Sequence, residues 1–232
     1  MIVALMSQKG GVGKSTLAAA VAWELHTRGH SVLVVDADPQ GTVVATGEAA
    51  AEQGVPAPTI VALGKDMWRP EQLPRLAESY DMVVIDTPGR AGDIQRAALM
   101  VSGVAVIPIG QTAADAWATR KALEVVEEAQ ISRPELQAVL CCAKVQPHTV
   151  VGRGARDVAE GAGVRVLRTE ITYRVGWQEC LGAGMGAGQY TDPVAAEETR
   201  ALVDELLALG GTRTKTKTKT KTKKKEGHHR GR

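Results

Sequence analysis

Residues that could bind phosphate are concentrated in the first sixteen positions of the chain, MIVALMSQKGGVGKST. An apolar run over residues 2–6 is typical of a short buried strand, and a glycine-rich segment, residues 10–13, follows it. Lys14, Ser15 and Thr16 then open a stretch of helix-forming residues. A strand, a glycine-rich loop, Lys-Ser and a helix in this order predict a phosphate-binding P-loop.

Each part of this loop has a physical task. Glycines let the backbone curl so that successive N–H groups face one anion, and the helix N-terminus adds partial positive charge. Lys14 would reach the β- and γ-phosphates, and the hydroxyl of Ser15 would hold Mg²⁺. The residues of this loop expected to contact the nucleotide are Gly10, Gly11, Val12, Gly13, Lys14, Ser15 and Thr16. The alternative is a glycine-rich turn that binds no ligand.

The loop departs from the G-x-x-x-x-G-K-[ST] spacing at its first position, where Gln8 stands. A second lysine, Lys9, precedes the glycines. KGGVGKST therefore resembles the deviant Walker A motif of the ParA/MinD family of ATPases, and the likeness extends over most of residues 1–209. This resemblance implies that Lys9 crosses an ATP-sandwiched dimer and reaches the nucleotide of the other subunit.

Two acidic motifs follow apolar runs that we expect to be strands. Asp36 and Asp38 lie in DADPQG, and Asp86 ends VVID before Thr-Pro-Gly. The carboxyl ends of parallel strands form the edge of an α/β sheet where ligands bind. An acid in the position of Asp86 binds Mg²⁺ through water, and the N–H of Gly89 would contact the γ-phosphate.

The resemblance assigns roles to the first acidic motif as well. It implies that Asp36 helps to hold hydrated Mg²⁺ and that Asp38 orients the attacking water. The expected catalytic residues are then Lys9, Lys14 and Asp38, and the expected metal ligands are Ser15, Asp36 and Asp86. The alternative for Asp36 and Asp38 is a helix cap or a turn.

Apolar runs rich in Val and Ile alternate with helical patterns along the chain. Strands of this kind are buried on both faces, which favours a parallel sheet between helices. The expected strands are residues 2–6, 31–36, 81–86, 103–109, 136–144 and 164–168. The expected helices are residues 15–28, 90–100, 113–130, 152–162 and 193–209. We therefore expect one α/β domain, residues 1–211, with a doubly wound, mostly parallel sheet of the P-loop NTPase type. Residues 47–80 read as irregular.

Charge is distributed unevenly along the chain. Residues 212–232 hold ten of the 28 basic residues and one acid, so this segment carries +9 and the remainder −7. A low-complexity segment without apolar residues is expected to be disordered. Its charge favours nucleic-acid binding through counterion release, and the alternative is a solubilising terminus. A second set of basic residues within 150–180 predicts a phosphate-contacting patch or ordinary surface arginines: Arg153, Arg156, Arg165, Arg168 and Arg174.

Other features concern location and base recognition. No apolar run approaches the roughly 18 residues that span a membrane, and the three cysteines form no C-x-x-C pair. We expect a cytoplasmic, nucleoid-associated protein in which Cys141 and Cys142 are buried thiols. Relatives often carry Asn-Arg or Thr-Arg where this chain has Ala143-Lys144, so we expect backbone groups or residues 169–172 to contact the base.

The resemblance to short ParA proteins implies a function. ATP and Mg²⁺ would close a homodimer that binds DNA nonspecifically, and a ParB-like or other small DNA-binding adaptor would stimulate an otherwise slow ATP hydrolysis. Such a protein segregates or positions a plasmid or other cargo. The alternatives are a MinD-like membrane-associated positioning ATPase, a metabolic P-loop enzyme of the same superfamily, and a nucleotide-locked scaffold.

Overall fold

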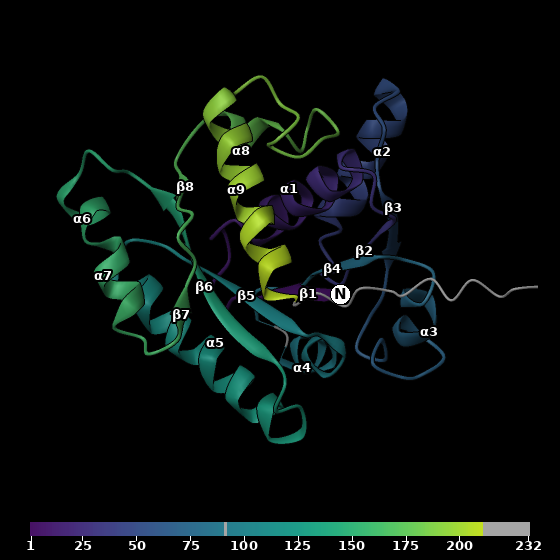
Figure 1. Ribbon diagram of the computed structural model, residues 1–232, viewed down its shortest axis with the longest axis horizontal. Helices are drawn as coiled ribbons and strands as arrows, with labels where there is room; N and C mark the ends of the chain where they lie inside the picture. The colour runs from purple at the N-terminus through teal and green to yellow at the C-terminus, as the bar shows by residue number, and fades with distance from the viewer. Residues whose placement is uncertain (91, 211–232) are drawn as a thin grey trace, which may run out of the picture.

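A central sheet organises the computed structural model, which describes residues 1–90 and 92–210 (Figure 1). The strands are β1 (Ile2–Leu5), β2 (Val32–Asp36), β3 (Thr59–Ala62), β4 (Met82–Asp86), β5 (Val104–Ile109), β6 (Gln137–Val145), β7 (Arg165–Val166) and β8 (Ile171–Thr172). The helices are α1 (Lys14–Thr27), α2 (Thr42–Gln53), α3 (Leu73–Ala77), α4 (Gly92–Val101), α5 (Ala113–Ser132), α6 (Val150–Arg153), α7 (Ala155–Glu160), α8 (Gly176–Glu179) and α9 (Pro193–Leu209). The expected alternation of strands and helices is confirmed.

The sheet is parallel and has β1 at its centre. Its strand order is β3-β2-β4-β1-β5-β6-β7, and β8 pairs with β6. In register, Asp86 of β4 lies between Leu5 of β1 and Asp36 of β2. The ends of the strands that carry the three motifs therefore meet at one edge of the sheet, as the α/β architecture requires. The doubly wound, mostly parallel fold is confirmed.

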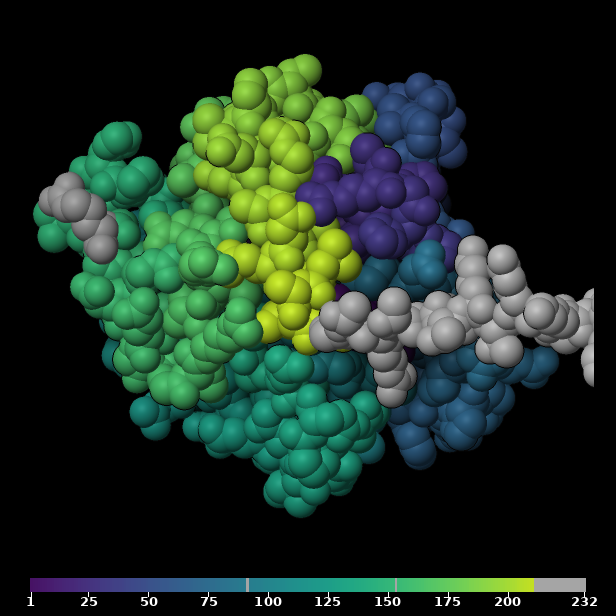
Figure 2. All heavy atoms as spheres, viewed as in Figure 1, coloured from purple at the N-terminus to yellow at the C-terminus, as the bar shows by residue number. Residues whose placement is uncertain are grey.

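Both faces of the sheet are buried, and single strands divide their side chains between two cores. In β5, Val104 and Val106 pack in a cluster with α1 and α9, whereas Ala105 and Ile107 pack in a cluster with α5. Figure 2 shows α9 (yellow) beside α1 (purple) on the viewed face, which covers the first of these cores. This double burial explains why the strands are near-continuous apolar runs.

Residues 47–80 are more regular than the sequence indicated. They contain the end of α2, the edge strand β3 and the short helix α3. No residue of β3 is fully buried, and it pairs with the sheet through β2 alone. Its apolar residues, IVA, are the same as those that begin β1, but the run is short and lies in a segment with Pro56, Pro58, Pro70 and Pro74, which favour irregular structure.

The C-terminal third also differs in detail from the expectation. The helix expected over residues 152–162 is two short helices, α6 and α7, which meet at Gly154. The strand expected over residues 164–168 is shorter, β7, and β8 follows as a further strand.

Cys141 and Cys142 are buried as expected. In the part of the chain that the structure describes, no helix combines the length and apolar character that crossing a membrane demands. The basic segment 212–232 lies outside the described residues.

Candidate nucleotide-binding site

The P-loop joins β1 to α1 and turns on two glycines. Gly11 and Gly13 have φ of 74° and 102°, in the left-handed region where a side chain would be strained. Gly13 is also the N-cap residue of α1, and no side chain caps this helix end. The first N–H groups of α1 are therefore available to an anion, as in other helix N-terminal phosphate sites.

Lys14 lies in this cradle with its side chain largely buried. It is 7% exposed, and its Nζ donates a long hydrogen bond of 3.5 Å to the carbonyl oxygen of Lys9. Burial lowers the pKa of Lys14, while the charges of Asp86 and Asp38 act in the opposite direction. A partly desolvated ammonium without a close carboxylate partner in the described chain is well suited to binding phosphate oxygens.

Lys9 is placed differently, although it lies in the same loop. Its Nζ lies 2.6 Å from Oδ1 of Asp115, and its side chain remains 41% exposed. Asp115 belongs to the capping box of α5, in which Thr112 is the N-cap residue. Burial raises the pKa of Asp115, but the hydrogen bonds from Lys9 and Thr112 outweigh it and leave the pKa low. In the single chain, Lys9 is therefore paired within its own subunit.

Asp86 is the group at this site whose hydrogen bonding is least complete. It is fully buried, and neither carboxylate oxygen has a hydrogen-bond partner among the described residues. Burial raises its pKa to about 7, with the Ser15 hydroxyl and Lys14 acting against this shift. An unpartnered buried carboxylate beside a hydroxyl fits Mg²⁺, which is commonly held by one or two carboxylates together with substrate phosphates.

Asp36 lies beside Asp86 on the neighbouring strand but has a different environment. Its Oδ2 accepts hydrogen bonds from the N–H groups of Val43 and Val44 at 2.9 and 3.0 Å. Its Oδ1 accepts one from the N–H of Asp38 at 3.1 Å. Asp36 thus accepts from the first turn of α2, although the N-cap residue of this helix is Gly41, so it has a structural role close to the alternative of a helix cap. Its role in holding Mg²⁺ stays a prediction.

Asp38 is half-buried, and its Oδ1 accepts a hydrogen bond from the N–H of Gln40 at 3.0 Å. Its charge also acts on Lys14 and Asp86, which places it electrostatically within the site. A carboxylate that is partly exposed and forms one local hydrogen bond keeps acceptor capacity for a water molecule. The proposed task of orienting the attacking water is compatible with this position and stays a prediction.

The segment after β4 lies directly on the P-loop. A Cβ added at Gly89 would lie 3.4 Å from the backbone nitrogen of Gly10 and 3.5 Å from Nζ of Lys14. Thr87 anchors the start of this segment because its hydroxyl donates to the carbonyl oxygen of Leu5 at 2.8 Å. Gly89 therefore occupies the position from which its backbone could sense a phosphate held by Lys14.

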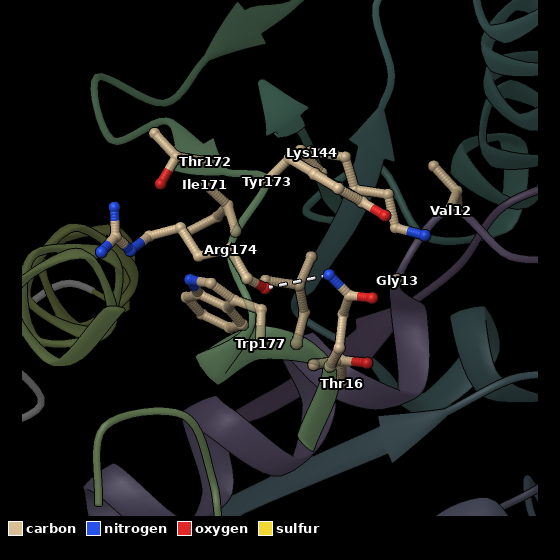
Figure 3. Close-up of a pocket in the computed structure, with 12 residues that line it drawn as sticks. Val12, Gly13, Thr16, Lys144, Ile171, Thr172, Tyr173, Arg174 and Trp177 are labelled. Carbon is tan, nitrogen blue, oxygen red and sulfur yellow. Dashed lines mark hydrogen bonds between the residues drawn. The ribbon is translucent and has the colours of Figure 1, made fainter. Parts of the chain in front are cut away.

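A pocket of about 220 Å³ opens beside the end of the P-loop (Figure 3). The residues labelled in the figure include Val12 and Thr16 from the P-loop side, Thr172 from β8, and Tyr173 and Trp177 from the chain after β8. The indole nitrogen of Trp177 donates to Glu198 at 2.9 Å, and this bond fixes the ring. A cavity with aromatic and aliphatic walls next to a phosphate site suits a nucleotide base. The expected base-contacting segment, residues 169–172, contributes Ile171 and Thr172 to it.

Lys144 lines the same pocket and is a site residue whose geometry the sequence did not disclose. Its φ of 57° is unusual for a residue other than glycine, and it lies at a register shift between β6 and β8. The Nζ of Lys144 donates a hydrogen bond to the carbonyl oxygen of Gly11 at 2.6 Å. The carbonyl oxygen of Lys144 accepts a hydrogen bond from the side-chain amide of Gln111. Lys144 thus links β6 to the P-loop. It stands at the position where we expected relatives to carry arginine.

The arginines of residues 150–180 do not form a uniform free patch. Arg156 is paired with Glu170 at 2.8 Å, and Arg174 is paired with Asp192 at 2.7 Å. Arg165 and Arg168 are exposed, although Nε of Arg168 lies 3.9 Å from Oε2 of Glu205, and the side chain of Arg153 lies outside what the structure describes. Only part of the predicted patch is therefore seen to be available to a phosphate backbone.

Similarity to known proteins agrees with this geometry. The chain is 30% identical over 212 residues to the "Maintenance of carboxysome distribution protein A" of Halothiobacillus neapolitanus, covering 88% of this chain and 95% of that protein. Two solved structures share the fold. An ATP complex of McdA from Cyanothece has a TM-score of 0.72 at 16% identity, over 90% of this chain and 96% of that one. MinD from Pyrococcus horikoshii with Mg-ADP has a TM-score of 0.68 at 21% identity, over 90% and 97%.

A family match extends over most of the chain. Residues 3–187 match the family described as "CobQ/CobB/MinD/ParA nucleotide binding domain". ATP and Mg²⁺ are the cofactors that the family and the donor set of the site support. The chain therefore belongs to the CobQ/CobB/MinD/ParA nucleotide-binding family, as its P-loop lysines and acidic motifs indicated.

Proposed function

We propose that this protein is a positioning ATPase that dimerises with ATP, binds DNA nonspecifically in that state, and hydrolyses ATP when an adaptor protein engages it. The observation that carries the proposal is the presence of two lysines with different surroundings in one P-loop. Lys14 is buried in the phosphate cradle, whereas Lys9 is half-exposed and paired with Asp115. A single phosphate site already served by Lys14 has no evident need for Lys9, so Lys9 is available to a second copy of the chain.

The residues of the chain divide the chemistry among them. Mg²⁺ bound at this site would supply positive charge that offsets the charge developing during phosphoryl transfer. The unpartnered carboxylate of Asp86 and the hydroxyl of Ser15 would hold that ion. Lys14 and the uncapped N–H groups of α1 bind the phosphate chain, and Asp38 orients the attacking water. Such a mechanism depends on positioning more than on covalent chemistry.

Dimerisation would require Lys9 to change partners. In the single chain its ammonium pairs with Asp115 at 2.6 Å, and this partner lies at the start of α5. A second nucleotide-loaded copy offers phosphate oxygens, which, like a carboxylate, accept charge-assisted hydrogen bonds from an ammonium. The exchange explains how binding of ATP, with its additional phosphate, could favour the dimer over the single chain.

The DNA and the adaptor are proposed from charge and from similarity. The relative of Halothiobacillus neapolitanus is named for the distribution of carboxysomes, which is a positioning task. The segment 212–232 carries +9, and exposed Arg165 and Arg168 add basic groups on the described surface. Lysines in a segment without apolar residues can contact phosphates but cannot read bases. A small DNA-binding adaptor would then connect the cargo to the ATPase.

Two alternatives are less well supported. A membrane-associated regulator would need an amphipathic segment with bulky apolar residues, and the basic residues 212–232 do not supply one. A metal-cluster carrier would need paired cysteines, but Cys141, Cys142 and Cys180 are all buried, and burial raises the pKa of each thiol. The positioning ATPase therefore remains the preferred function.

The decisive experiment compares two lysine variants by light scattering with MgATP and with MgADP. The wild-type chain should double its mass with MgATP and stay monomeric with MgADP. Lys9→Ala should bind ATP but stay monomeric, because the lysine offered to the second copy is missing. Lys14→Ala should lose nucleotide binding itself. Lys65→Ala removes an exposed lysine outside the P-loop and serves as the matched control. Normal ATP-dependent dimers of Lys9→Ala would contradict the proposed role of this residue.

A further inference from the structure

Gln95 is a buried amide at the meeting point of three functional segments. It lies in the first turn of α4 and is 0% exposed. Its Nε2 donates to the carbonyl oxygen of Ser7 at 3.0 Å and to that of Pro88 at 2.7 Å. Its Oε1 accepts from Nε2 of Gln8 at 2.6 Å. One side chain thus connects the start of the P-loop, the segment after β4 and α4.

The chemistry of the partners fixes the orientation of this amide. A backbone carbonyl oxygen can only accept, so the two carbonyls of Ser7 and Pro88 require the nitrogen of Gln95 to face them. Both hydrogens of that nitrogen are then used. The oxygen faces Gln8, which must present its own nitrogen. Because every N–H is used and the site excludes water, loss of any one partner leaves a buried polar group unsatisfied.

The bond to Pro88 matters because of the residue that follows it. Gly89 lies against the backbone nitrogen of Gly10 and Nζ of Lys14, the groups expected to hold phosphate. A phosphate held there would contact this segment, and the coupling requires that the contact shifts it. The carbonyl of Pro88 then either breaks its bond to Gln95 or carries the first turn of α4 with it. The bond to Ser7 provides the fixed end, since Ser7 lies two residues after the end of β1 and is itself buried.

We infer that Gln95 is a positioning residue that couples the segment after β4 to the P-loop and transmits the nucleotide state to α4. This inference rests on the proposed function, because it assumes that the site distinguishes ATP from ADP. Gln95 touches no reacting atom in this account. It sets where Gly89 and Asp86 lie relative to Lys14, and it links their movement to a helix that reaches the surface through exposed Asp93 and Arg96.

The same contact gives a reason for the unusual residue at position 8. The standard P-loop spacing has glycine there, and a glycine could not donate to Gln95. The side chain of Gln8 is half-buried and supplies the third bond of the connection. Gln8 and Gln95 should therefore act as a pair, with non-additive effects when both are changed.

Gln95→Met tests the coupling because methionine keeps the length of the side chain and removes all of its hydrogen bonds. Gln130→Met is the matched control, since Gln130 also donates to a backbone carbonyl, that of Leu136 at 2.7 Å, but before the start of β6 and thus away from the P-loop edge. Three quantities are measured for each protein: affinity for MgADP, kcat and KM for ATP hydrolysis, and amide hydrogen exchange of residues 86–101 with MgATP and with MgADP.

The expected result is a split between binding and turnover. Gln95→Met should bind MgADP within about twofold of wild type, because the P-loop contacts remain, while kcat falls about tenfold or more. The difference in exchange of α4 between MgATP and MgADP should disappear. Gln8→Met keeps both carbonyl bonds of Gln95 and should lower kcat less, at unchanged MgADP affinity. If Gln95→Met does not fold, this second variant decides the question alone.

Two outcomes would overturn the inference. Wild-type kcat together with wild-type ATP-dependent exchange in Gln95→Met would make Gln95 a packing residue only. A parallel loss of MgADP affinity and kcat would show that the P-loop itself is disordered by the change. If the wild-type chain gives the same exchange with both nucleotides, the proposed function fails first, and the coupling fails with it.

Discussion

At the residue scale, the most informative group is Asp86, because its burial disfavours the charged form of its carboxyl group. The carboxylate is fully buried, has no hydrogen-bond partner among the described residues, and has a pKa raised to about 7. A structure selected for stability alone would place an apolar residue there. The cost is consistent with a group retained for binding a cation, since functional sites commonly hold residues that stability disfavours.

This burial predicts a pH dependence of stability in the protein without nucleotide and Mg²⁺. Between the ordinary pKa of 3.8 and about 7, the folded chain holds a proton on Asp86 that the unfolded chain releases. The free energy of unfolding should therefore fall as pH rises through this window, by up to roughly 4 kcal/mol from this group. Asp86→Asn should remove that fall and leave the variant more stable than wild type at pH 8.

The measurement is urea unfolding of wild type and Asp86→Asn at several values between pH 5 and 8. The difference between the two curves isolates Asp86 from the other titrating groups, which both proteins share. If the free energies of unfolding of the two proteins stay parallel from pH 5 to pH 8, Asp86 is ionised when buried. Its raised pKa could then no longer support a role in binding a cation.

At the scale of single elements, α2 shows how one motif can serve both structure and chemistry. Asp36 accepts from the N–H groups of Val43 and Val44 in the first turn of α2, whereas Asp38 forms one local bond at a half-exposed position. Asp36→Ala should lower the free energy of unfolding by about 1–3 kcal/mol, because buried N–H groups lose a charged acceptor. Asp38→Ala should change stability little but abolish ATP hydrolysis while keeping ATP binding and dimerisation.

Thermal unfolding and phosphate release, measured on both variants, separate the two roles. If Asp38→Ala and Asp36→Ala lower the free energy of unfolding equally, Asp38 would be a capping residue. Unchanged turnover in Asp38→Ala would move the search for the water-orienting group to Asp36 or Asp86. The two carboxylates lie two residues apart and serve as controls for each other.

The same elements show what the sequence could and could not predict. The P-loop and the strands around it were predictable because each is a local pattern of glycine, lysine and apolar residues. β3 was missed because its short apolar run lies among prolines that favour irregular structure. Gln95 and Lys144 were missed as site residues because their contacts join positions 88 and 133 residues apart. No local pattern encodes such contacts, and one buried glutamine in a helix resembles many others.

At the scale of the whole molecule, the charge asymmetry predicts how DNA is held. Residues 1–211 carry −7, so the globular part should repel DNA unless local basic groups or the segment 212–232 attach it. Nucleotide-dependent binding would then belong to the dimer surface, and nucleotide-independent attraction to the terminal segment. The two contributions can be separated because they respond differently to salt and to ATP.

Deleting residues 212–232 should weaken DNA binding and flatten its salt dependence. Each phosphate contact contributes roughly −0.9 to the slope of log K against log salt, so losing about four contacts changes the slope by more than three. A variant of equal length with Gln at the ten basic positions, tested at matched salt, distinguishes charge from chain length. DNA of any sequence should behave alike, and MgATP should still strengthen the remaining binding. If the truncated protein keeps the full affinity and slope, the segment has no part in DNA binding. If it binds no DNA with any nucleotide, the ATP-dependent dimer surface is the part of the proposal that fails.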